Sequence, residues 1–389
     1  MNDKLNISIE ESLLLRLCRL DFDVEMKVML QAIVEKVKDW QYFATLANSH
    51  GVAALVYNNL GKLGFLRFIP DETVAFLKNT QLLSISRNAR FADMMKEVLM
   101  LLNSEQVKTV LLKGMALEHM VYENRGLRQM SDVDVLVARE DCIRAQNALI
   151  FNGFTQLPLK SAIHKLIIPY TGKHLPTLIK NGFSIELHHE LFGTGKNELT
   201  KMFFDTSEET ELADEKVFIP RPQIFFLYLV KHLYLHEIKN ESQLRLYTDL
   251  VVLLGKFRED IINYDLLKYA NQAGMSEILA CRLEPLRELW GISFPGWIND
   301  FIDKWNDPTS INKFVFFLKS PKNNLPLDQA WFYRNTLRDI PRFYRKVIFV
   351  IGDLFPTLTF MKKRYGCKTG WKAVIYYPHR LGKLLYLFR

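Results

Sequence analysis

The chain has 389 residues and a mass of 45.5 kDa, which exceeds one average domain and predicts two or three packed units. Hydrophobic residues make up 49% of the chain and charged residues 24%, as in soluble globular proteins, and the 27 Phe, 15 Tyr and 6 Trp exclude a disordered chain. The first residues lack the basic start and apolar run of a signal peptide, and the longest apolar runs fall short of the ~18–20 residues of a membrane span. We therefore expect neither secretion nor a membrane span.

The N-terminal 104 residues predict a helical cap. Apolar residues recur at helical spacing from Met26 to Leu46, and Gly51 follows as a stop signal. A second helix is expected over Val52–Leu60 and a long third helix over Asp71–Asn103. Asp71 and Glu72 would place negative charge in the first turn of that third helix.

Residues 105–220 carry the strand signals of the chain and predict an α/β core. The expected strands are Val107–Leu112, Asp132–Val137, Ile163–Tyr170 and Phe183–His189, and the expected helices are Ala116–Tyr122 and Glu140–Asn152. The stretch from Glu190 to Pro220 is polar and acidic, and we interpret it as a surface excursion.

Residues 221–300 predict a helical domain, and residues 301–389 a basic, aromatic-rich C-terminal region. The expected helices are Pro222–Leu235, Leu244–Phe257, Tyr264–Ala273 and Ser276–Leu289. The aromatic residues of the C-terminal region would fill a small core, and stacking on bases or contact with a membrane is the alternative. A mixed sheet flanked by N-terminal and C-terminal helical regions places the chain in the α+β fold class.

The net charge of +8 is unevenly distributed. The segment from Arg334 to Arg389 contains 13 Lys and Arg residues against two Asp, so it carries +11, whereas the rest of the chain carries −3. Such a segment attracts a polyanion or an anionic membrane, and a solvated basic helix face explains it equally well.

The four cysteines are scattered and show no paired spacing. They are Cys18, Cys142, Cys281 and Cys367. This usage argues against a disulfide framework or a structural zinc site and predicts a reducing, cytoplasmic location.

Asp132 and Asp134 alternate with valines in a predicted strand. Alternate side chains share one face of a strand, so the two carboxylates would project together while Val133 and Val135 enter the core. Two close carboxylates repel each other unless a cation lies between them, and Mg²⁺ is the cation that prefers such oxygen ligands. Two incidental aspartates on an exposed edge strand are the alternative.

Three further features surround this pair. Lys113 and Gly114 follow an apolar strand at the start of a predicted helix, where backbone N–H groups and a lysine charge can hold a phosphate. Arg128 precedes the strand on a loop, where its guanidinium could grip a phosphate with two hydrogen bonds. Glu186 and His188 share one face of a later strand, so Glu186 would add a third carboxylate and His188 could bind a phosphate or orient a metal ligand.

These motifs, in this order, resemble the bacterial nucleotidyltransferase-like family within the DNA polymerase β-type nucleotidyltransferase superfamily. The matching stretches are Leu112-Lys113-Gly114, Arg128-x-x-Ser-Asp132-Val-Asp134-Val-Leu-Val and Ile185-Glu186-Leu-His188, with further matches at Ser49-His50-Gly51 and Lys173-His174-Leu175-Pro176. The resemblance covers roughly residues 30–260. It implies a mixed-sheet nucleotidyltransferase core.

The resemblance also implies roles for single residues. Asp132, Asp134 and Glu186 would be the catalytic carboxylates and the Mg²⁺ ligands. The nucleotide would be contacted by Lys113, Gly114, Met115, Arg128 and His188. In this chain Lys113-Gly114-Met115 replaces the Gly-Ser pair of the superfamily, so the small hydroxyl that touches a phosphate there is missing.

The activity implied by the resemblance is Mg²⁺-dependent transfer of a nucleoside monophosphate from an NTP to an unknown acceptor, which could be a small molecule, a tRNA or a protein. One variant of this activity is a toxin-like enzyme that modifies tRNA or protein, with the basic C-terminal region holding RNA. A catalytically silent scaffold that binds a nucleotide or a partner is a rival from another class. The intact set of three carboxylates favours an enzyme over the scaffold.

Overall fold

The computed structural model describes residues 6–122, 124–193, 198–241, 243–305, 307, 309–320 and 329–387. The chain forms two compact units, each built from three separate segments. The first unit comprises Met1–Asp93, Lys113–Ser131 and Pro220–Leu325, and the second comprises Met94–Leu112, Asp132–Ile219 and Pro326–Arg389. The domain limits expected at residues 104, 220 and 300 stay a prediction.

The first unit begins with four short helices: α2 (Ile9–Leu17), α3 (Val24–Val34), α4 (Trp40–Ser49) and α5 (Ala53–Lys62). The single helix expected from Met26 to Leu46 is wrong, because the chain breaks after Val34 and restarts at Trp40. Asp39 causes the restart, since its side chain accepts a hydrogen bond from the backbone N–H of Tyr42 at 2.7 Å and caps α4. The expected second helix is confirmed by α5.

The remaining elements of the first unit are also helical. They are η1 (Leu66–Phe68), α7 (Lys113–Met120), α10 (Pro222–Ile238), α11 (Leu244–Lys256), α12 (Arg258–Ile261), α13 (Tyr264–Gln272), α14 (Ser276–Glu288), α15 (Gly296–Lys304) and α16 (Ser310–Lys319). The helices expected between residues 222 and 289 are confirmed by α10, α11, α13 and α14. Every residue from Gln223 to Val230 of α10 is buried, so this helix forms the centre of the core.

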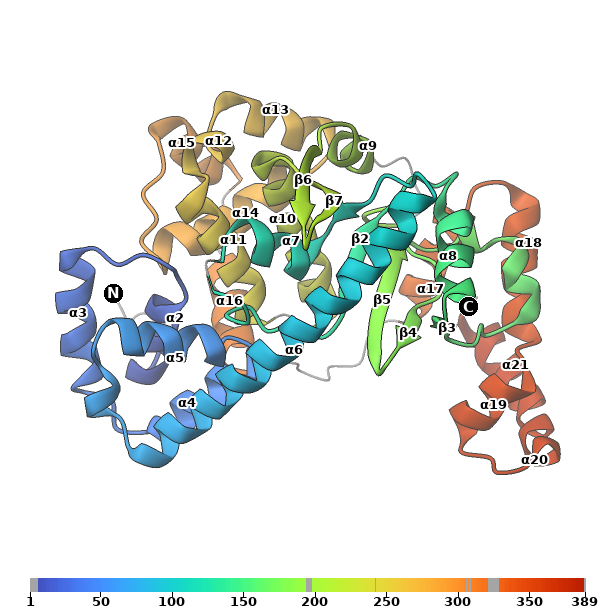
Figure 1. Ribbon diagram of the computed structural model, residues 1–389, viewed down its shortest axis with the longest axis horizontal. Coiled ribbons are helices and arrows are strands. Elements are labelled where there is room, and N and C mark those ends of the chain that lie inside the picture. Colours follow the sequence, from blue (N-terminus) through green and yellow to red (C-terminus); the bar gives the residue numbers. More distant parts are fainter. Residues whose placement is uncertain are drawn as a thin grey trace. The chain divides into compact units, whose positions relative to one another are not determined.

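One long helix belongs to both units. α6 (Asp71–Ser104) spans 34 residues and confirms the long helix predicted over Asp71–Asn103, and Figure 1 shows it as an unbroken ribbon. Its first part, up to Asp93, lies in the first unit, and the part from Met94 lies in the second.

The sheet lies entirely in the second unit. Its strands are β1 (Val110–Leu111), β2 (Val133–Leu136), β3 (Thr155–Gln156), β4 (Leu178–Lys180), β5 (Phe183–His188), β6 (Glu208–Leu212) and β7 (Glu215–Ile219). Among the described residues these seven strands form one sheet in the order β3-β4-β5-β2-β1-β7-β6. β2 runs parallel to β5, and β1 runs parallel to β7 and antiparallel to β2. The sheet is therefore mixed, and with the flanking helices it gives the predicted α+β fold.

Two hairpins depart from the prediction. The stretch from Glu190 to Pro220 is not only a surface excursion, because it contains α9 (Glu198–Asp205) and the strands β6 and β7. β7 pairs with β1 and so enters the sheet. The hairpin of β4 and β5, which lie side by side in Figure 1, turns at Asn181 and Gly182. Both residues have positive φ angles, of 53° and 81°, as a two-residue type I′ turn requires.

The strand expected at Ile163–Tyr170 is also wrong. This segment forms two short 3₁₀ helices, η2 (Ala162–Leu166) and η3 (Ile168–Tyr170). Pro169 has no N–H group to donate to a sheet, and the ring of His164 bonds instead to the carbonyl oxygen of Phe349 at 3.1 Å.

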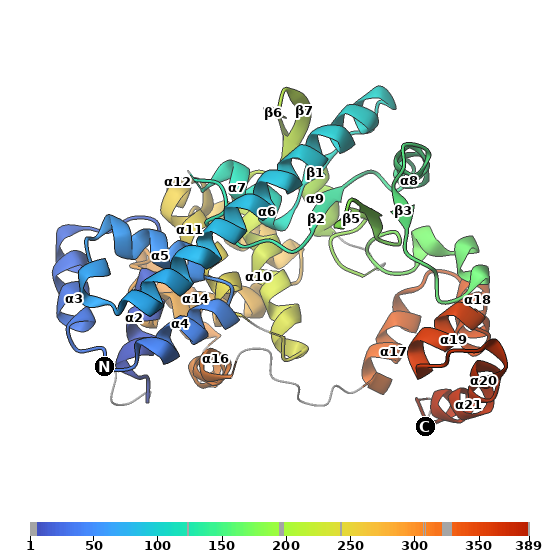
Figure 2. The ribbon, with the colours of Figure 1, turned by 60° about the horizontal axis from the view of Figure 1, so that its bottom comes forward.

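The C-terminal helices of the second unit pack on this 3₁₀ segment and on the residues before it. They are α17 (Gln329–Asp339), α18 (Phe343–Leu354), α19 (Leu358–Tyr365), α20 (Gly370–Val374) and α21 (Tyr376–Leu387), and Figure 2 shows them gathered near the C-terminus. The buried Asp353 carboxylate forms an ion pair with Lys160, and the N–H of Thr357 donates to the carbonyl of Lys160 at 2.8 Å. Helix α8 (Cys142–Phe151) packs against β5 in the same unit.

No helix within the described ranges is both long and apolar enough to cross a membrane. All four cysteines are free thiols, three of them buried.

Candidate metal centre

The parallel pairing of β2 with β5 brings two acidic residues together. Asp134 of β2 is the register partner of Glu186 of β5, and their neighbours Val133 and Val135 pair with Ile185 and Leu187. Partners in a sheet project to the same face, so both carboxylates leave the sheet together while the apolar neighbours enter the core. The alternating sequence of each strand thus creates the acidic pair.

His188 completes a compact cluster with this pair. Its Nε2–H group donates a hydrogen bond to Oδ1 of Asp134 at 2.8 Å and lies 3.4 Å from Oε2 of Glu186. One ligand atom of each of the three residues lies within 4.8 Å of the others. Asp134 and His188 are buried and Glu186 is partly exposed, so the cluster opens at its Glu186 side.

His174 and Thr177 form a second layer around Glu186. Thr177 donates its hydroxyl to Oε1 of Glu186 at 3.3 Å, and Nε2 of His174 lies 3.6 Å from Oε2. The Nδ1–H of His174 donates to the carbonyl of Leu175 at 2.7 Å, which fixes the ring so that Nε2 faces the carboxylate. A backbone bridge between His174 and His188 holds the two histidines side by side.

The electrostatics of the cluster favour a charged Glu186. Burial alone would raise the pKa of this carboxyl, but the hydrogen bond from His188 and the nearby His174 outweigh burial and lower it. Burial lowers the pKa of His174, although the Glu186 carboxylate acts in the opposite direction. The site therefore presents an ionised carboxylate beside two histidines.

The donor chemistry fits a divalent cation. Asp134 and Glu186 offer carboxylate oxygens, the ligands that Mg²⁺ prefers, and His188 offers an imidazole nitrogen that Mn²⁺ or Zn²⁺ also accepts. A cation between the two carboxylates would replace the Nε2–H proton of His188, which now lies in the hydrogen bond to Asp134.

Asp132 stands apart from this group. β2 begins at Val133, so Asp132 lies one residue before the strand, and its half-buried side chain is outside the cluster that meets within 4.8 Å. The chain passes from the first unit to the second between Ser131 and Asp132. The alternation expected over Asp132–Val137 thus holds from Val133 onward, and the role predicted for Asp132 stays a prediction.

The comparison with protein families identifies the chain. The sequence model of a family described as Uncharacterised nucleotidyltransferase matches residues 36–291. The chain belongs to this family. The match includes every residue predicted for the site and confirms that the sequence motifs indicate a nucleotidyltransferase family.

Other comparisons add little to this assignment. The crystal structure of an antigenic nucleotidyltransferase-like protein from Paracoccidioides brasiliensis shares 12% identity with this nucleotidyltransferase family member, at a TM-score of 0.30. The alignment covers 54% of this chain and 93% of the fungal chain. No curated protein gives a significant match.

Four of the residues predicted to contact the nucleotide in this nucleotidyltransferase family member lie in the first unit, namely Lys113, Gly114, Met115 and Arg128, whereas His188 lies in the second. Lys113 begins α7 directly after Leu112, whose N–H donates to the carbonyl oxygen of Asp134 at 3.1 Å. Lys113 has a φ of 44°, a left-handed conformation that non-glycine residues adopt at a cost of about 1–2 kcal/mol. The structure thus confirms that a strand ends and a helix begins at Lys113-Gly114. The phosphate contact stays a prediction.

Gly114 and Met115 are both buried, and packing explains the glycine. A Cβ atom on Gly114 would overlap the guanidinium of Arg128 and lie 2.7 Å from the sulfur of Met130. The side chain of Met115 is only 4% exposed. A nucleotide contact at these two positions would therefore involve backbone atoms.

Arg128 is engaged within the first unit. Its Nε and one terminal nitrogen donate to the two carboxylate oxygens of Asp249 in α11, at 2.9 and 2.7 Å. Asn88 of α6 holds the carbonyl of Arg128 at 2.9 Å. Arg128 does form two hydrogen bonds with one acceptor group, as expected, but that group is the carboxylate of Asp249 and not a phosphate.

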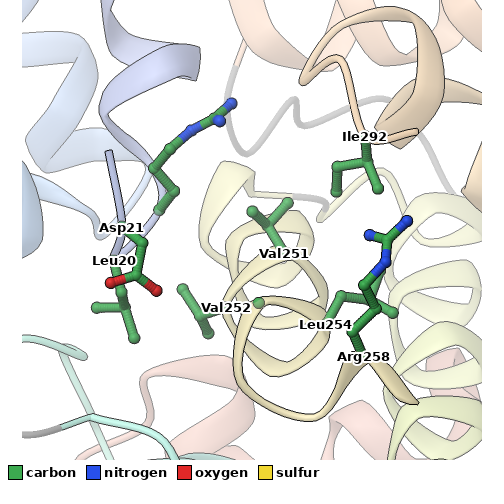
Figure 3. A pocket seen from close by; sticks show the side chains of 9 residues that line it. Leu20, Asp21, Val251, Val252, Leu254, Arg258 and Ile292 are labelled. Atoms are coloured by element: carbon green, nitrogen blue, oxygen red, sulfur yellow. The ribbon is translucent and has the colours of Figure 1, made fainter. Parts of the chain in front are cut away.

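The first unit also contains a cavity of about 200 Å³, shown in Figure 3. It lies beside α11, where Val251, Val252 and Leu254 give it apolar walls, and Asp21 and Arg258 lie on different sides of it. None of the predicted site residues lines this cavity.

Sequence reasoning missed Thr177 and the pairing of Asp249 with Arg128, and it included His174 only as part of the Lys173-His174-Leu175-Pro176 match. The Asn181-Gly182 dipeptide was the available signal for Thr177 and His174, because a two-residue hairpin there places β4 beside β5 and brings the segment before β4 next to Glu186. No local pattern points to Asp249, since its partner lies 121 residues away.

Proposed function

We propose that this protein is a Mg²⁺-dependent nucleotidyltransferase that moves a nucleoside monophosphate from an NTP to an acceptor. The observation that carries the proposal is the Asp134–Glu186–His188 cluster on adjacent parallel strands of a member of a nucleotidyltransferase family. Family membership supports nucleotidyl transfer, and the cluster supports the metal. The proposed partners are an NTP and an acceptor that is a small molecule, a tRNA or a protein. For the basic C-terminal region the proposed partner is a polyanion or an anionic membrane.

In the proposed reaction a hydroxyl or phosphate oxygen of the acceptor bonds to the α-phosphorus of the NTP, and the bond from that phosphorus to pyrophosphate breaks. Mg²⁺, held by Asp134 and Glu186 with Asp132, would neutralise the charge that builds up on the phosphate oxygens. One carboxylate of this set accepts the proton of an attacking hydroxyl. Thr177 and His174 orient Glu186 for this task through the contacts that they make with its two oxygens.

His188 has a positioning role in this proposal. Its hydrogen bond at 2.8 Å sets the rotamer of Asp134, and its distance of 3.4 Å from Glu186 keeps both carboxylates directed to one point. Lys113, Gly114 and Met115 are proposed to contact the NTP phosphates, in keeping with their place at the strand-to-helix junction. The cytoplasmic location predicted from the cysteines would give the enzyme access to NTPs.

The first test is calorimetric binding of the four NTPs with and without Mg²⁺. We expect one NTP to bind only with Mg²⁺, and Asp134→Asn to weaken that binding at least tenfold. Glu211→Gln is the matched control, because Glu211 is an exposed carboxylate on β6 of the same unit, outside the cluster. Equal binding by wild type and Asp134→Asn would refute the metal site. Absence of binding for all four NTPs would favour a silent scaffold.

A further inference from the structure

The chain after Asp353 is exclusively basic among its charged residues. Residues 354–389 contain eight Lys and Arg and no Asp or Glu. In the part that the structure describes, Lys363, Arg364, Lys368 and Lys372 are exposed on α19, on α20 and on the loop between them. A segment of this composition generates a positive potential that no acidic side chain of the same segment offsets.

Large apolar side chains lie exposed among these charges. Trp371 is 64% exposed, Val374 51% and Ile375 64%. Positions i, i+3 and i+4 share one face of a helix, so the three side chains form one apolar face on α20 and the residue after it. The opposite side of α20 packs inward through Ala373, which is fully buried. The helix is thus amphipathic, with its apolar outer face directed to solvent.

A groove adjoins this face. It has a volume of about 920 Å³ and is lined by residues that include Tyr365, Lys368, Trp371, Lys372, Tyr376 and His379. Tyr365 and Tyr376 are stacked with ring centroids 4.4 Å apart, which makes one wall rigid. No carboxylate is among the lining residues, so the groove presents two ammonium groups and an imidazole to whatever enters it.

We propose that α19, α20 and the start of α21 form a docking surface for an anionic lipid bilayer. Trp371, Val374 and Ile375 would enter the boundary between headgroups and acyl chains, where tryptophan and aliphatic side chains are favoured. Lys363, Arg364, Lys368 and Lys372 would lie at the level of the headgroup phosphates, and the groove would receive one phosphate-bearing headgroup. Attachment is peripheral, since no described helix can cross a membrane.

The exposed aliphatic residues favour a bilayer over RNA. Single-stranded nucleic acid is bound by aromatic side chains that stack on bases and by cations that pair with phosphates, and it offers nothing to aliphatic side chains. Val374 and Ile375 are two of the three exposed apolar side chains of this face, and Leu381 of α21 is 47% exposed as well. Burial of these side chains requires an apolar partner beneath a layer of anions.

The test is cosedimentation of the full chain with two kinds of vesicle. One contains phosphatidylcholine alone, and the other also contains about 30% phosphatidylglycerol, which gives its surface a negative potential. We expect binding only to the anionic vesicles. Lys368→Ala/Lys372→Ala should lower the partition coefficient about 30-fold at low salt, since each charge near such a surface contributes roughly fivefold. Lys165→Ala/Lys201→Ala is the control, because it removes two exposed charges from the same unit outside this surface. That control should bind as wild type.

A second variant separates insertion from charge attraction. Trp371→Ala/Ile375→Ala should lower binding to anionic vesicles equally at 50 mM and 500 mM salt, whereas the lysine effect should shrink at high salt (about a threefold shorter screening length). Circular dichroism would verify that each variant is folded. Absence of binding to anionic vesicles overturns the proposal, and so does salt-dependent binding of single-stranded RNA without vesicle binding. Neither outcome bears on NTP binding, so this inference is tested independently of the proposed activity.

Discussion

The ion pair between Arg128 and Asp249 is the contact that the amino-acid sequence indicates least. Both side chains are buried, and their two hydrogen bonds form a closed ion pair between α11 and the loop that precedes β2. Removal of one partner deprives the other of both hydrogen bonds of this ion pair in a buried environment. We expect Asp249→Ala to lower the free energy of unfolding by roughly 3–5 kcal/mol. Urea denaturation followed by circular dichroism measures this change.

A double variant provides the control for this prediction. Arg128→Met/Asp249→Leu replaces both charges with apolar groups and should recover most of the lost stability. An unfolding free energy for Asp249→Ala within about 1 kcal/mol of wild type would contradict the buried pair.

His50 should make the first unit sensitive to acid. Its Nδ1 accepts the N–H of Leu244 at 3.0 Å and its Nε2–H donates to the carbonyl of Leu318 at 2.8 Å, so the neutral ring uses both nitrogens. Burial lowers the pKa of His50 in the folded state. The unfolded chain therefore binds more protons below its own histidine pKa of about 6.5, and stability falls as the pH drops below that value.

The expected slope is about 1.4 kcal/mol for each pH unit, down to the lowered pKa of the folded state. Unfolding free energies of wild type and His50→Gln between pH 8 and pH 5 test this. The variant should be less stable at pH 8, because it loses the hydrogen-bond geometry, and its stability should depend less on pH. Parallel pH profiles for the two proteins would rule out His50 as the source.

Residue patterns predicted the acidic pair but not its surroundings. Asp134 and Glu186 could be found because each sits in an alternating strand, where the period of two fixes the face of every side chain. Asp132 shows the limit of this reasoning, since the strand starts one residue after it. The engagement of Arg128 could not be predicted, because its partner comes from a helix 121 residues later.

At the scale of elements, long helices were predicted well and short strands poorly. α11 carries apolar periodicity over 13 residues, α10 is apolar on all sides over most of its 17 residues, and α6 runs for 34 residues without Gly or Pro, and local sequence reveals all three features. β6 reads Glu-Glu-Thr-Glu-Leu and lies at the edge of the sheet, where charged residues are normal but the alternation of a half-buried strand is absent. Pairing with β7, not residue preference, makes this segment a strand.

The β4–β5 hairpin depends on the backbone of its turn. Gly182 has a φ of 81° and no atom within 4 Å of the position that a Cβ would take, so only backbone strain opposes a side chain there. We expect Gly182→Ala to lower the free energy of unfolding by about 1–2 kcal/mol. Thermal or urea unfolding of the two proteins gives the difference.

Gly382 is the matched control in the same unit. It lies in α21, also without an atom within 4 Å of a Cβ, but its backbone is helical. Gly382→Ala should therefore raise stability by about 0.5–1 kcal/mol. The same sign for both substitutions would show that the turn conformation has no influence.

At the scale of the whole molecule, the C-terminal helices complete the second unit. The buried Asp353 carboxylate pairs with Lys160, Ser161 donates to the carbonyl of Phe355 at 3.0 Å, and the guanidinium of Arg345 stacks on Tyr170. A chain that ends at Ser320 loses all three contacts. We expect residues 157–170 to exchange amide hydrogens at least tenfold faster in this shortened chain, because their partners are gone.

Hydrogen exchange followed by mass spectrometry measures this effect along the chain. Residues 24–62 belong to the first unit, which keeps all its segments up to Ser320, and they should exchange as in the full chain. Faster exchange over both segments would instead indicate that the two units unfold together.

The interleaving of the two units bears on how the protein is made. The chain passes between the units five times, and the first unit needs α10 and α11, which follow Asp93 by more than 120 residues. At the usual rate of synthesis the apolar faces of α2 to α5 would stay exposed for on the order of 10 s before these partners leave the ribosome. The second unit cannot complete its folding before Asp353 has left the ribosome, because Asp353 pairs with Lys160. The nascent polypeptide is therefore expected to be a client of chaperones that shield apolar segments, since the first unit lacks its third segment until residues 220–325 have been made.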